Sequence, residues 1–363
     1  MKVHLQTFTV YLRSFPGVHE PLAQQTNLFV RVEHDGIEGW GVASPLLRGH
    51  TETINDVQTI KDIARSLQKV APLLISYHPT ERQKIARFLD SLDPVALPSV
   101  ARSALDLALY DWFGKALNLP LYAILGLDLE GMGQTAATID LRNYDQVRDR
   151  KRDWLKQIPE LQELTVKLGS NEGIESDKLM FLSAKNASPD LQSISVDAGG
   201  GWTLSDALHM QDWLAKQGVT YIEQPIAPGY EDDLRVLYER SAIPIFAVSS
   251  CQTSRDIPAL SDRIHGITIK LSQCGGLSEA IKMIHTARAH GLKVKLGCCP
   301  SDGVLMNTAL SHLAPLADYL DISSHLNFKN DPFNGATLVH GRLIPNDRPG
   351  LGVQHGVRNR GGN

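Results

Sequence analysis

The amino-acid sequence predicts an α/β protein built around a closed parallel barrel of the TIM type. From about residue 134, short apolar segments typical of strands alternate with helical segments at intervals of roughly 25 to 30 residues. The connecting segments are short, and none contains the Gly-rich phosphate-binding turn of a doubly wound open sheet. The predicted barrel strands are residues 135–140, 164–169, 193–198, 220–225, 243–249, 266–272, 292–298 and 319–323.

The segment that precedes the barrel has a different pattern. Residues 1–13 and 26–45 have the alternation of strands, and Asp35-Gly36 between two alternating runs is a strong hairpin signal. The polar residues 14–26 between them are predicted to form a loop long enough to reach over a neighbouring site. Helical periodicity follows at about residues 51–70, 79–92 and 98–118.

The composition is that of a globular protein without a nucleic-acid or membrane partner. The 363 residues include 36 basic and 40 acidic side chains spread along the chain, for a net charge of −4, so no basic surface is indicated. No apolar run approaches the ~18 residues needed to span a bilayer. The four cysteines have no framework spacing, which favours a reducing environment. We therefore predict a cytoplasmic protein.

Charged side chains stand at the predicted carboxyl ends of several barrel strands, the edge at which such barrels place their active sites. Lys167 belongs to the second strand and Lys270 to the sixth, and these strands face each other across a barrel of eight. A lysine buried in an apolar strand loses hydration, so its pKa falls toward the range of a useful base. Two such groups suit removal of a proton from one face of a substrate and delivery to the other. The remaining candidates at strand ends are Asp140, Asp197, Glu223, Cys298, Ser301 and Asp321.

A metal site is expected beside these lysines. Removal of a proton next to a carboxylate creates an enediolate, whose charge needs a divalent cation or a preorganised cluster of positive charge. Asp197 and Glu223 are 26 residues apart and supply two of the three carboxylates that would hold Mg²⁺. The next step of 25 residues reaches Val248. We therefore expect Mg²⁺ to bind weakly or to be absent.

Several motifs together resemble the enolase superfamily, in the muconate-lactonizing branch that contains muconate cycloisomerases and dipeptide epimerases. They extend over almost the whole chain: "ARSALDLALYDWFGKALNLPLYAILG" (101–126), "TVKLG", "VDAGGGW", "YIEQP", "IKLSQCGGL" (269–277) and "GRLIPNDRPGLGV" (341–353). The resemblance implies a modified (β/α)7β TIM-type barrel with an α+β capping domain formed by the N-terminal segment and the C-terminal tail. The implied division is 1–125 for the capping domain, 126–326 for the barrel and 327–363 for the returning tail.

The same resemblance implies roles for individual residues. Lys167 and Lys270 would be the acid/base pair, and Asp197 and Glu223 would be Mg²⁺ ligands. The substrate would be a small carboxylate molecule, and the chain would form a homo-oligomer. Residues expected to contact the substrate are Thr138, Thr165, Cys298, Asp321 and Ser323.

The sequence also departs from the family pattern. Where the family has Ala-Asp-Glu-Ser-Cys, this chain has Val248 and Ser249 in place of both acidic residues. Thr165 replaces the first lysine of a Lys-x-Lys pair, and Ser323 replaces the second acid of an Asp-x-Asp pair that holds a substrate ammonium group in dipeptide epimerases. Ser301 stands where a glutamate is expected, with Asp302 one position further on.

Three functional hypotheses follow. The first is an isomerase of the epimerase, racemase or cycloisomerase type, or a related lyase, that removes a proton α to a carboxylate and acts on a dipeptide or amino-acid derivative. The second is an altered site with different chemistry. The third is a non-catalytic or metal-independent protein that binds a small molecule, in which Asp197 and Glu223 would pair directly with Lys167 and Lys270. Substrate choice is expected to depend on the loop 14–26 and the region of His50.

Overall fold

A computed structural model of the chain confirms the parallel barrel. It describes residues 1–11, 24–45, 59–92, 96–140 and 146–356. Eight parallel strands follow one another in the sheet in chain order, and a bridge between Thr135 and Leu320 joins the first strand's edge to the last. The barrel strands are β4 (Ala137–Ile139), β5 (Glu163–Lys167), β6 (Ser193–Asp197), β7 (Ile222–Glu223), β8 (Ile245–Ala247), β9 (Gly266–Ile269), β10 (Lys293–Gly297) and β11 (Tyr319–Asp321).

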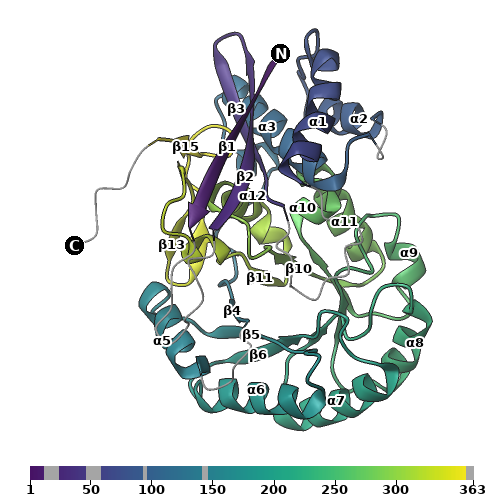
Figure 1. Ribbon diagram of the computed structural model, residues 1–363. Helices are drawn as coiled ribbons and strands as arrows, with labels where there is room; N and C mark the ends of the chain where they lie inside the picture. Colours follow the sequence, from purple (N-terminus) through teal and green to yellow (C-terminus); the bar gives the residue numbers. More distant parts are fainter. Residues whose placement is uncertain (12–23, 46–58, 93–95, 141–145, 357–363) are drawn as a thin grey trace.

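Helices follow seven of these strands, which gives the (β/α)7β order (Figure 1). Their inward faces carry the apolar residues that cover the barrel, such as Phe181 of α6 and Leu214 of α7. The helices are α5 (Val147–Gln157), α6 (Ile174–Asn186), α7 (Leu204–Gln217), α8 (Glu231–Arg240), α9 (Ile257–Leu260), α10 (Leu271–Cys274), α11 (Leu277–Ala289) and α12 (Val304–Leu313). The short 3-10 turns Ala314–Leu316 and Ser324–Asn327 flank β11.

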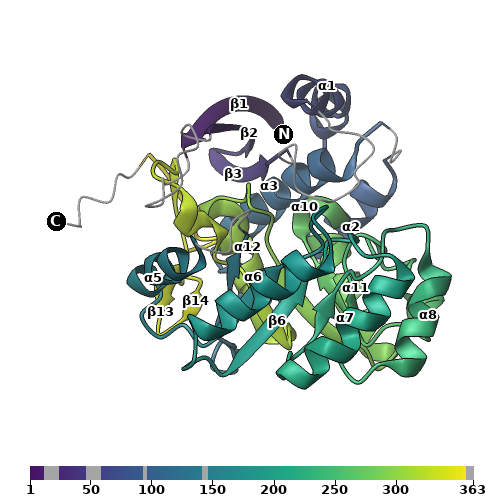
Figure 2. The ribbon, with the colours of Figure 1, turned by 60° about the horizontal axis from the view of Figure 1, so that its bottom comes forward.

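The N-terminal part forms a separate antiparallel sheet that lies over one end of the barrel together with its own helices (Figures 1 and 2). The predicted hairpin is present, and Asp35 (φ 51°) and Gly36 (φ 74°) adopt the left-handed geometry of a type I′ turn. The elements are β1 (Lys2–Tyr11), β2 (Gln24–His34), β3 (Ile37–Ala43), α1 (Ile60–Val70), a 3-10 turn (Ala71–Leu74), α2 (Arg82–Asp90), α3 (Ser99–Leu117) and α4 (Leu121–Ile124).

Helix α3 is the central element of this part and is buried along most of its length. Strand β3 packs directly on it because Gly39 and Gly41 have no side chains. A Cβ atom at either glycine would collide with the carbonyl oxygens of Ala108 or Ala104. The "GWG" sequence of β3 therefore permits a close backbone contact between the sheet and the helix.

The C-terminal tail returns to this N-terminal part, as expected. Asp111 of α3 accepts hydrogen bonds from the backbone N–H groups of Trp40 in β3 and Leu351 in the tail, at 2.8 Å each. The tail contains β12 (Phe333–Asn334), β13 (Thr337–Val339), β14 (Arg342–Ile344) and β15 (Gln354–His355). Antiparallel pairs form between β12 and β15 and between β13 and β14.

Some details differ from the predictions or lie outside the described residues. Residues 24–26, predicted to belong to the loop 14–26, are part of β2, where Gln25 and Thr26 pair with β1. The rest of that loop and His50 lie almost entirely outside the described residues. The division at residues 125 and 326 stays a prediction. Within the described part of the chain, no helix is long and apolar enough to cross a membrane.

Candidate active site

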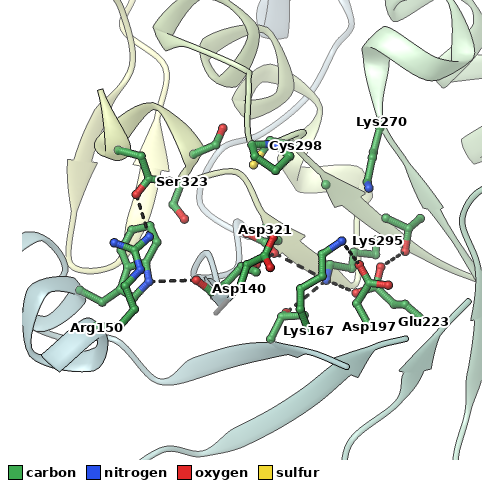
Figure 3. Close-up of a pocket in the computed structure, with 18 residues that line it drawn as sticks. Asp140, Arg150, Lys167, Asp197, Glu223, Lys270, Lys295, Cys298, Asp321 and Ser323 are labelled. Atoms are coloured by element: carbon green, nitrogen blue, oxygen red, sulfur yellow. Dashed lines mark hydrogen bonds and ion pairs between the residues drawn. The ribbon is translucent and has the colours of Figure 1, made fainter. Parts of the chain in front are cut away.

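A pocket opens at the carboxyl ends of the barrel strands (Figure 3). It brings together the two predicted proton-transfer lysines, the five side chains predicted to contact the substrate and the two predicted metal ligands. The lining residues are Thr138, Asp140, Arg150, Trp154, Thr165, Lys167, Asp197, Glu223, Thr268, Lys270, Lys295, Gly297, Cys298, Pro300, Asp321, Ser323, Ser324 and Asn327.

The strand register explains why the charged residues meet. Lys167 is paired with Asp197, and Asp197 with Glu223, so these three residues stand at the same height on neighbouring strands. Lys270 directly follows β9, which is four strands away from β5 in the sheet order. In a closed barrel of eight strands, that separation puts the two lysines on opposite walls. Figure 3 shows their amino groups pointing into the same space from different sides.

Asp197 lies between the two lysines. Its Oδ2 is 3.1 Å from Lys167 Nζ, and its Oδ1 accepts a hydrogen bond of 2.9 Å from the N–H of Gly199. Burial by itself would raise the pKa of Asp197, but the charges of Lys167 and Lys270 outweigh burial and lower this pKa to about 2. One carboxylate thus faces the amino groups of both lysines.

Glu223 is held by a lysine that the sequence analysis did not select. Lys295 of β10 points into the barrel, and its Nζ lies 2.6 Å from Glu223 Oε1. Thr268 donates a hydrogen bond of 2.6 Å to Glu223 Oε2, so both carboxylate oxygens are engaged. Burial opposes charge on Lys295, but Glu223 and Asp321 outweigh it and raise the pKa of this lysine well above its ordinary value. In a metal-free site Glu223 was expected to pair with one of the two predicted lysines, and the structure gives it Lys295 as an ion-pair partner.

Asp321 lies on the wall next to Lys295. Its Oδ2 accepts a hydrogen bond of 2.5 Å from Thr138 and lies 3.9 Å from Lys295 Nζ. Ser323 donates to the carbonyl of Ala136 at 3.0 Å, which fixes its hydroxyl on the first strand. Burial and the nearby Asp321 raise the pKa of Cys298 to about 12, so its sulfur is a neutral thiol.

Arg150 is a second lining residue that the sequence analysis did not select. It comes from α5, and its guanidinium lies 4.5 Å from the ring centre of Trp154. It donates a hydrogen bond of 2.9 Å to Asn327, and Figure 3 shows it close to Asp140. Burial lowers the pKa of Arg150 to about 10, which still leaves it positively charged at neutral pH.

Neither missed residue had a clear sequence signal. Lys295 sits in "KVKLG", where two lysines in alternation resemble the exposed face of a strand, and only Lys293 is exposed. The one indication in the sequence was that Thr165 replaces a lysine of the family pattern. In the structure, Lys295 Nζ lies 3.4 Å from Thr165 Oγ1, next to the position from which that lysine is missing. Arg150 lies within a run of charged residues in α5 that predicts a solvated helix face.

Two other residues weighed from the sequence do not line the pocket. Asp302 is fully buried, and its Oδ2 accepts a hydrogen bond of 2.7 Å from the N–H of Cys299. Burial raises the pKa of Asp302 to about 7, against the opposing effects of that hydrogen bond and of Lys270. Ser301 is buried beside it. Asp302 thus accepts a hydrogen bond from the backbone outside the pocket lining, and it does not replace the carboxylate missing at Val248.

Comparison with known proteins identifies the family. Residues 14–126 match the model of the mandelate racemase / muconate lactonizing enzyme N-terminal domain, and residues 158–356 match the enolase C-terminal domain-like model. The chain belongs to the muconate-lactonizing branch of the enolase superfamily. It is 37% identical over 364 residues to a hydrophobic dipeptide epimerase of Roseobacter litoralis, with 97% of this chain and 98% of the relative covered.

Other members of the branch agree. A hydrophobic dipeptide epimerase of a Flavobacteria bacterium is 35% identical over 328 residues, with 90% of each chain covered. The crystal structure of the dipeptide epimerase from Enterococcus faecalis, complexed with Mg and the dipeptide L-Leu-L-Tyr, has a TM-score of 0.84 at 23% identity and covers 98% of this chain and 99% of its own. The chain is an isomerase of the enolase superfamily that binds a small molecule.

Mg²⁺ is typical of the superfamily, but the residues present here do not fit it. The third ligand position is Val248, a buried apolar side chain. All four oxygens of the two remaining candidate ligands accept contacts from Lys167, Gly199, Lys295 or Thr268. Across the described ranges, no group of three His, Cys, Asp or Glu side chains is arranged to hold a metal ion.

Proposed function

We propose that this isomerase inverts the configuration at the α-carbon of a dipeptide or a closely related amino-acid derivative. The observation that supports this reaction most strongly is the position of Lys167 and Lys270. They come from opposite walls of one pocket and both act on the same carboxylate, Asp197. A substrate bound between them presents one face of its α-carbon to each amine.

The proposed proton transfers use only these two side chains. The neutral amine of one lysine takes the α-hydrogen as a proton, and the electron pair of the C–H bond moves into the adjacent carboxylate to give an enediolate. The ammonium group of the other lysine then donates a proton to the opposite face of the α-carbon, which forms the new C–H bond. Exchange with solvent resets both lysines. The reaction consumes no oxidant, reductant or second substrate.

The substrate class is proposed from the pocket and from the relatives. The two relatives described above are named as hydrophobic dipeptide epimerases, and another at 35% identity, from Bacteroides thetaiotaomicron, is named as an L-Ala-D/L-Glu epimerase. A dipeptide carries an ammonium group as well as a carboxylate, and Asp321, oriented by Thr138, offers an anionic partner for the ammonium group. We place the substrate carboxylate near Lys167 and Lys270, and the ammonium group toward Asp321. Thr165, Cys298 and Ser323 would shape the space between these ends.

Deuterium exchange tests the proposal directly. The protein is incubated in deuterated water with a panel of dipeptides, starting with L-Leu-L-Tyr, and loss of the α-hydrogen signal is followed by NMR. We expect exchange with at least one dipeptide. Conversion of one epimer into the other should decrease by about 100-fold or more in Lys167→Ala and in Lys270→Ala, because each variant lacks one of the two proton-transfer groups that inversion needs.

A matched control is Lys293→Ala, which removes an exposed lysine from a barrel strand outside the pocket lining. This variant should retain the exchange rate of the unmodified protein. Epimerisation that persists in Lys270→Ala would remove this residue from its proposed role, and a complete lack of exchange across the panel would contradict the proposed reaction.

The oligomeric state and the cellular location of the protein are also proposals. The first rests on the family resemblance and the second on the composition. The chain would associate as a homo-oligomer, which light scattering of the purified protein would test. It would also be located in the cytoplasm, which cell fractionation would test.

A further inference from the structure

The arrangement around Glu223 differs from what a divalent metal site requires. A carboxylate ligand must have at least one oxygen facing the ion, and Mg²⁺ accepts little departure from its preferred octahedral geometry. Here Lys295 Nζ lies 2.6 Å from Oε1 of Glu223, and the Thr268 hydroxyl donates to Oε2 at 2.6 Å. Only 2% of the Lys295 side chain and 3% of the Glu223 side chain are exposed. Glu223 therefore already has a buried positive charge as its partner.

Contacts from several strands position the amino group of Lys295. Besides Glu223 of β7, it lies 3.4 Å from Thr165 Oγ1 of β5 and 3.9 Å from Asp321 Oδ2 of β11. It also lies 5.3 Å from the ring centre of Tyr221, a distance suited to a cation–π contact. If the ammonium group moved away from these partners but stayed inside the barrel, it would be a buried charge without a partner, which is strongly unfavourable. The protein thus holds Lys295 at Glu223 with groups from both sides of the barrel.

The charge balance of the pocket leads to the same conclusion. Among the residues that the structure describes, four basic side chains and four carboxylates line it: Arg150, Lys167, Lys270, Lys295, Asp140, Asp197, Glu223 and Asp321. With all eight ionised, these described side chains together have no net negative charge that a divalent cation would neutralise. Val248 and Ser249 stand where the family pattern has Asp and Glu. The chain therefore lacks two negative charges of that pattern and has the positive charge of Lys295 in the pocket lining.

We propose that the Lys295 ammonium group replaces the divalent metal ion as the counter-charge of Glu223, so that this pocket works without Mg²⁺. The substrate carboxylate then meets lysine ammonium groups in place of a metal ion. This inference concerns the same pocket as the proposed function, but it rests on the ion pair itself, and its test contains no substrate. The two proposals can therefore fail separately.

Metal titration of four full-length proteins tests the inference. Mn²⁺ and Mg²⁺ are titrated by calorimetry into the unmodified protein, Val248→Asp, Lys295→Met and the double variant Val248→Asp/Lys295→Met. We expect no saturable binding up to millimolar metal in the unmodified protein and little gain in Val248→Asp. The double variant should bind Mn²⁺ at least 10-fold more tightly than Val248→Asp, because only there is Glu223 released toward a restored third carboxylate.

Two controls separate charge from side-chain size and position. Val248→Asp/Lys295→Arg keeps a positive charge beside Glu223 and should bind metal no better than Val248→Asp. Val248→Asp/Lys293→Met changes an exposed lysine of the same strand and should also match Val248→Asp. Circular dichroism establishes that each variant is folded before titration.

The outcomes decide the proposal. Saturable binding of one metal ion by the unmodified protein at micromolar concentration would overturn it. Val248→Asp binding as tightly as the double variant would also overturn it, since Lys295 would then not compete with the metal. If variants at position 295 fail to fold, Val248→Asp alone still tests the proposal, because saturable binding of one metal ion by this variant at micromolar concentration would overturn it.

Discussion

Lys295 and Glu223 form a buried ion pair whose stability depends on both partners being present. The net contribution of such a pair to folding is small, because the attraction between the charges is offset by the loss of their hydration. Removal of one partner is different, since the remaining charge stays in a medium that solvates it poorly. Glu223 would keep only the hydrogen bond from Thr268 if Lys295 were replaced by an apolar residue.

We predict that Lys295→Met lowers the free energy of unfolding by about 3 to 5 kcal/mol, because it leaves the buried Glu223 carboxylate without its charged partner. Urea denaturation at pH 7 measures this change. The double variant Glu223→Gln/Lys295→Met should recover most of the loss, since a neutral amide can still accept the Thr268 hydrogen bond. A loss below about 1 kcal/mol in Lys295→Met would show that the carboxylate is solvated or paired elsewhere.

Helix α11 depends on a carboxylate from a different part of the chain. Asp106 of α3 is fully buried and accepts hydrogen bonds from the N–H of Ser278 at 3.0 Å and from its hydroxyl at 2.6 Å. Ser278 is in the first turn of α11, so this carboxylate satisfies a backbone donor that the helix itself leaves unpaired. The contact joins the N-terminal part to the barrel.

This carboxylate predicts a pH dependence of stability. Burial raises the pKa of Asp106 to about 6, against the opposing effects of Ser278 and Arg102, while its unfolded value is near 3.8. The folded protein therefore binds more protons between these two pH values, so stability should fall as the pH rises from about 4 to about 6 and then stay level, by about 3 kcal/mol in all. Denaturation at a series of pH values measures this change.

Asp106→Asn is the matched variant, because a neutral amide can accept from the Ser278 N–H and donate to the Ser278 hydroxyl. Its stability should lack the part of the pH dependence that Asp106 contributes between pH 4 and pH 6. Identical pH profiles for the variant and the unmodified protein would contradict the assignment of this change to Asp106.

The secondary structure followed from the sequence more completely than the contacts did. All eight barrel strands occur where alternating apolar segments predicted them, although β7 contains only Ile222–Glu223 of the predicted 220–225. The opposed lysines could also be predicted, because strand number alone determines which walls face each other. The partner of Glu223 could not be predicted, since Lys295 is 72 residues away and meets Glu223 only across the closed barrel. Local patterns contain no information about such contacts.

At the scale of the whole molecule, one side chain connects the N-terminal sheet, helix α3 and the C-terminal tail. Asp111 is fully buried and accepts hydrogen bonds from the N–H groups of Trp40 and Leu351 and from Lys115 Nζ at 2.7 Å. The tail also meets the N-terminal strand, where the N–H of Lys329 donates to the carbonyl of Tyr11 at 2.9 Å. These bonds hold the first and last parts of the chain together over the barrel (Figure 1).

We predict that Asp111→Ala lowers the free energy of unfolding by about 2 to 4 kcal/mol, because two buried backbone N–H groups lose their acceptor. Hydrogen exchange should increase at Trp40, at Leu351 and in β12 and β15, while amides of the barrel strands β5 and β6 stay protected. Lys115→Met removes a partly exposed contact of the same carboxylate and should have a much smaller effect on both backbone sites. Equal exchange changes in the barrel and the tail would contradict this local role.

The central claim is that lysines, and no metal ion, supply the positive charge for chemistry in this pocket. The measurement that tests it most directly is α-deuterium incorporation into L-Leu-L-Tyr or another accepted dipeptide by metal-stripped protein, in deuterated water, with excess EDTA and then with added Mg²⁺. We predict an exchange rate that neither EDTA nor Mg²⁺ changes by more than about twofold, while inversion of the α-carbon is lost in Lys270→Ala. Exchange that EDTA abolishes and Mg²⁺ restores would contradict the claim.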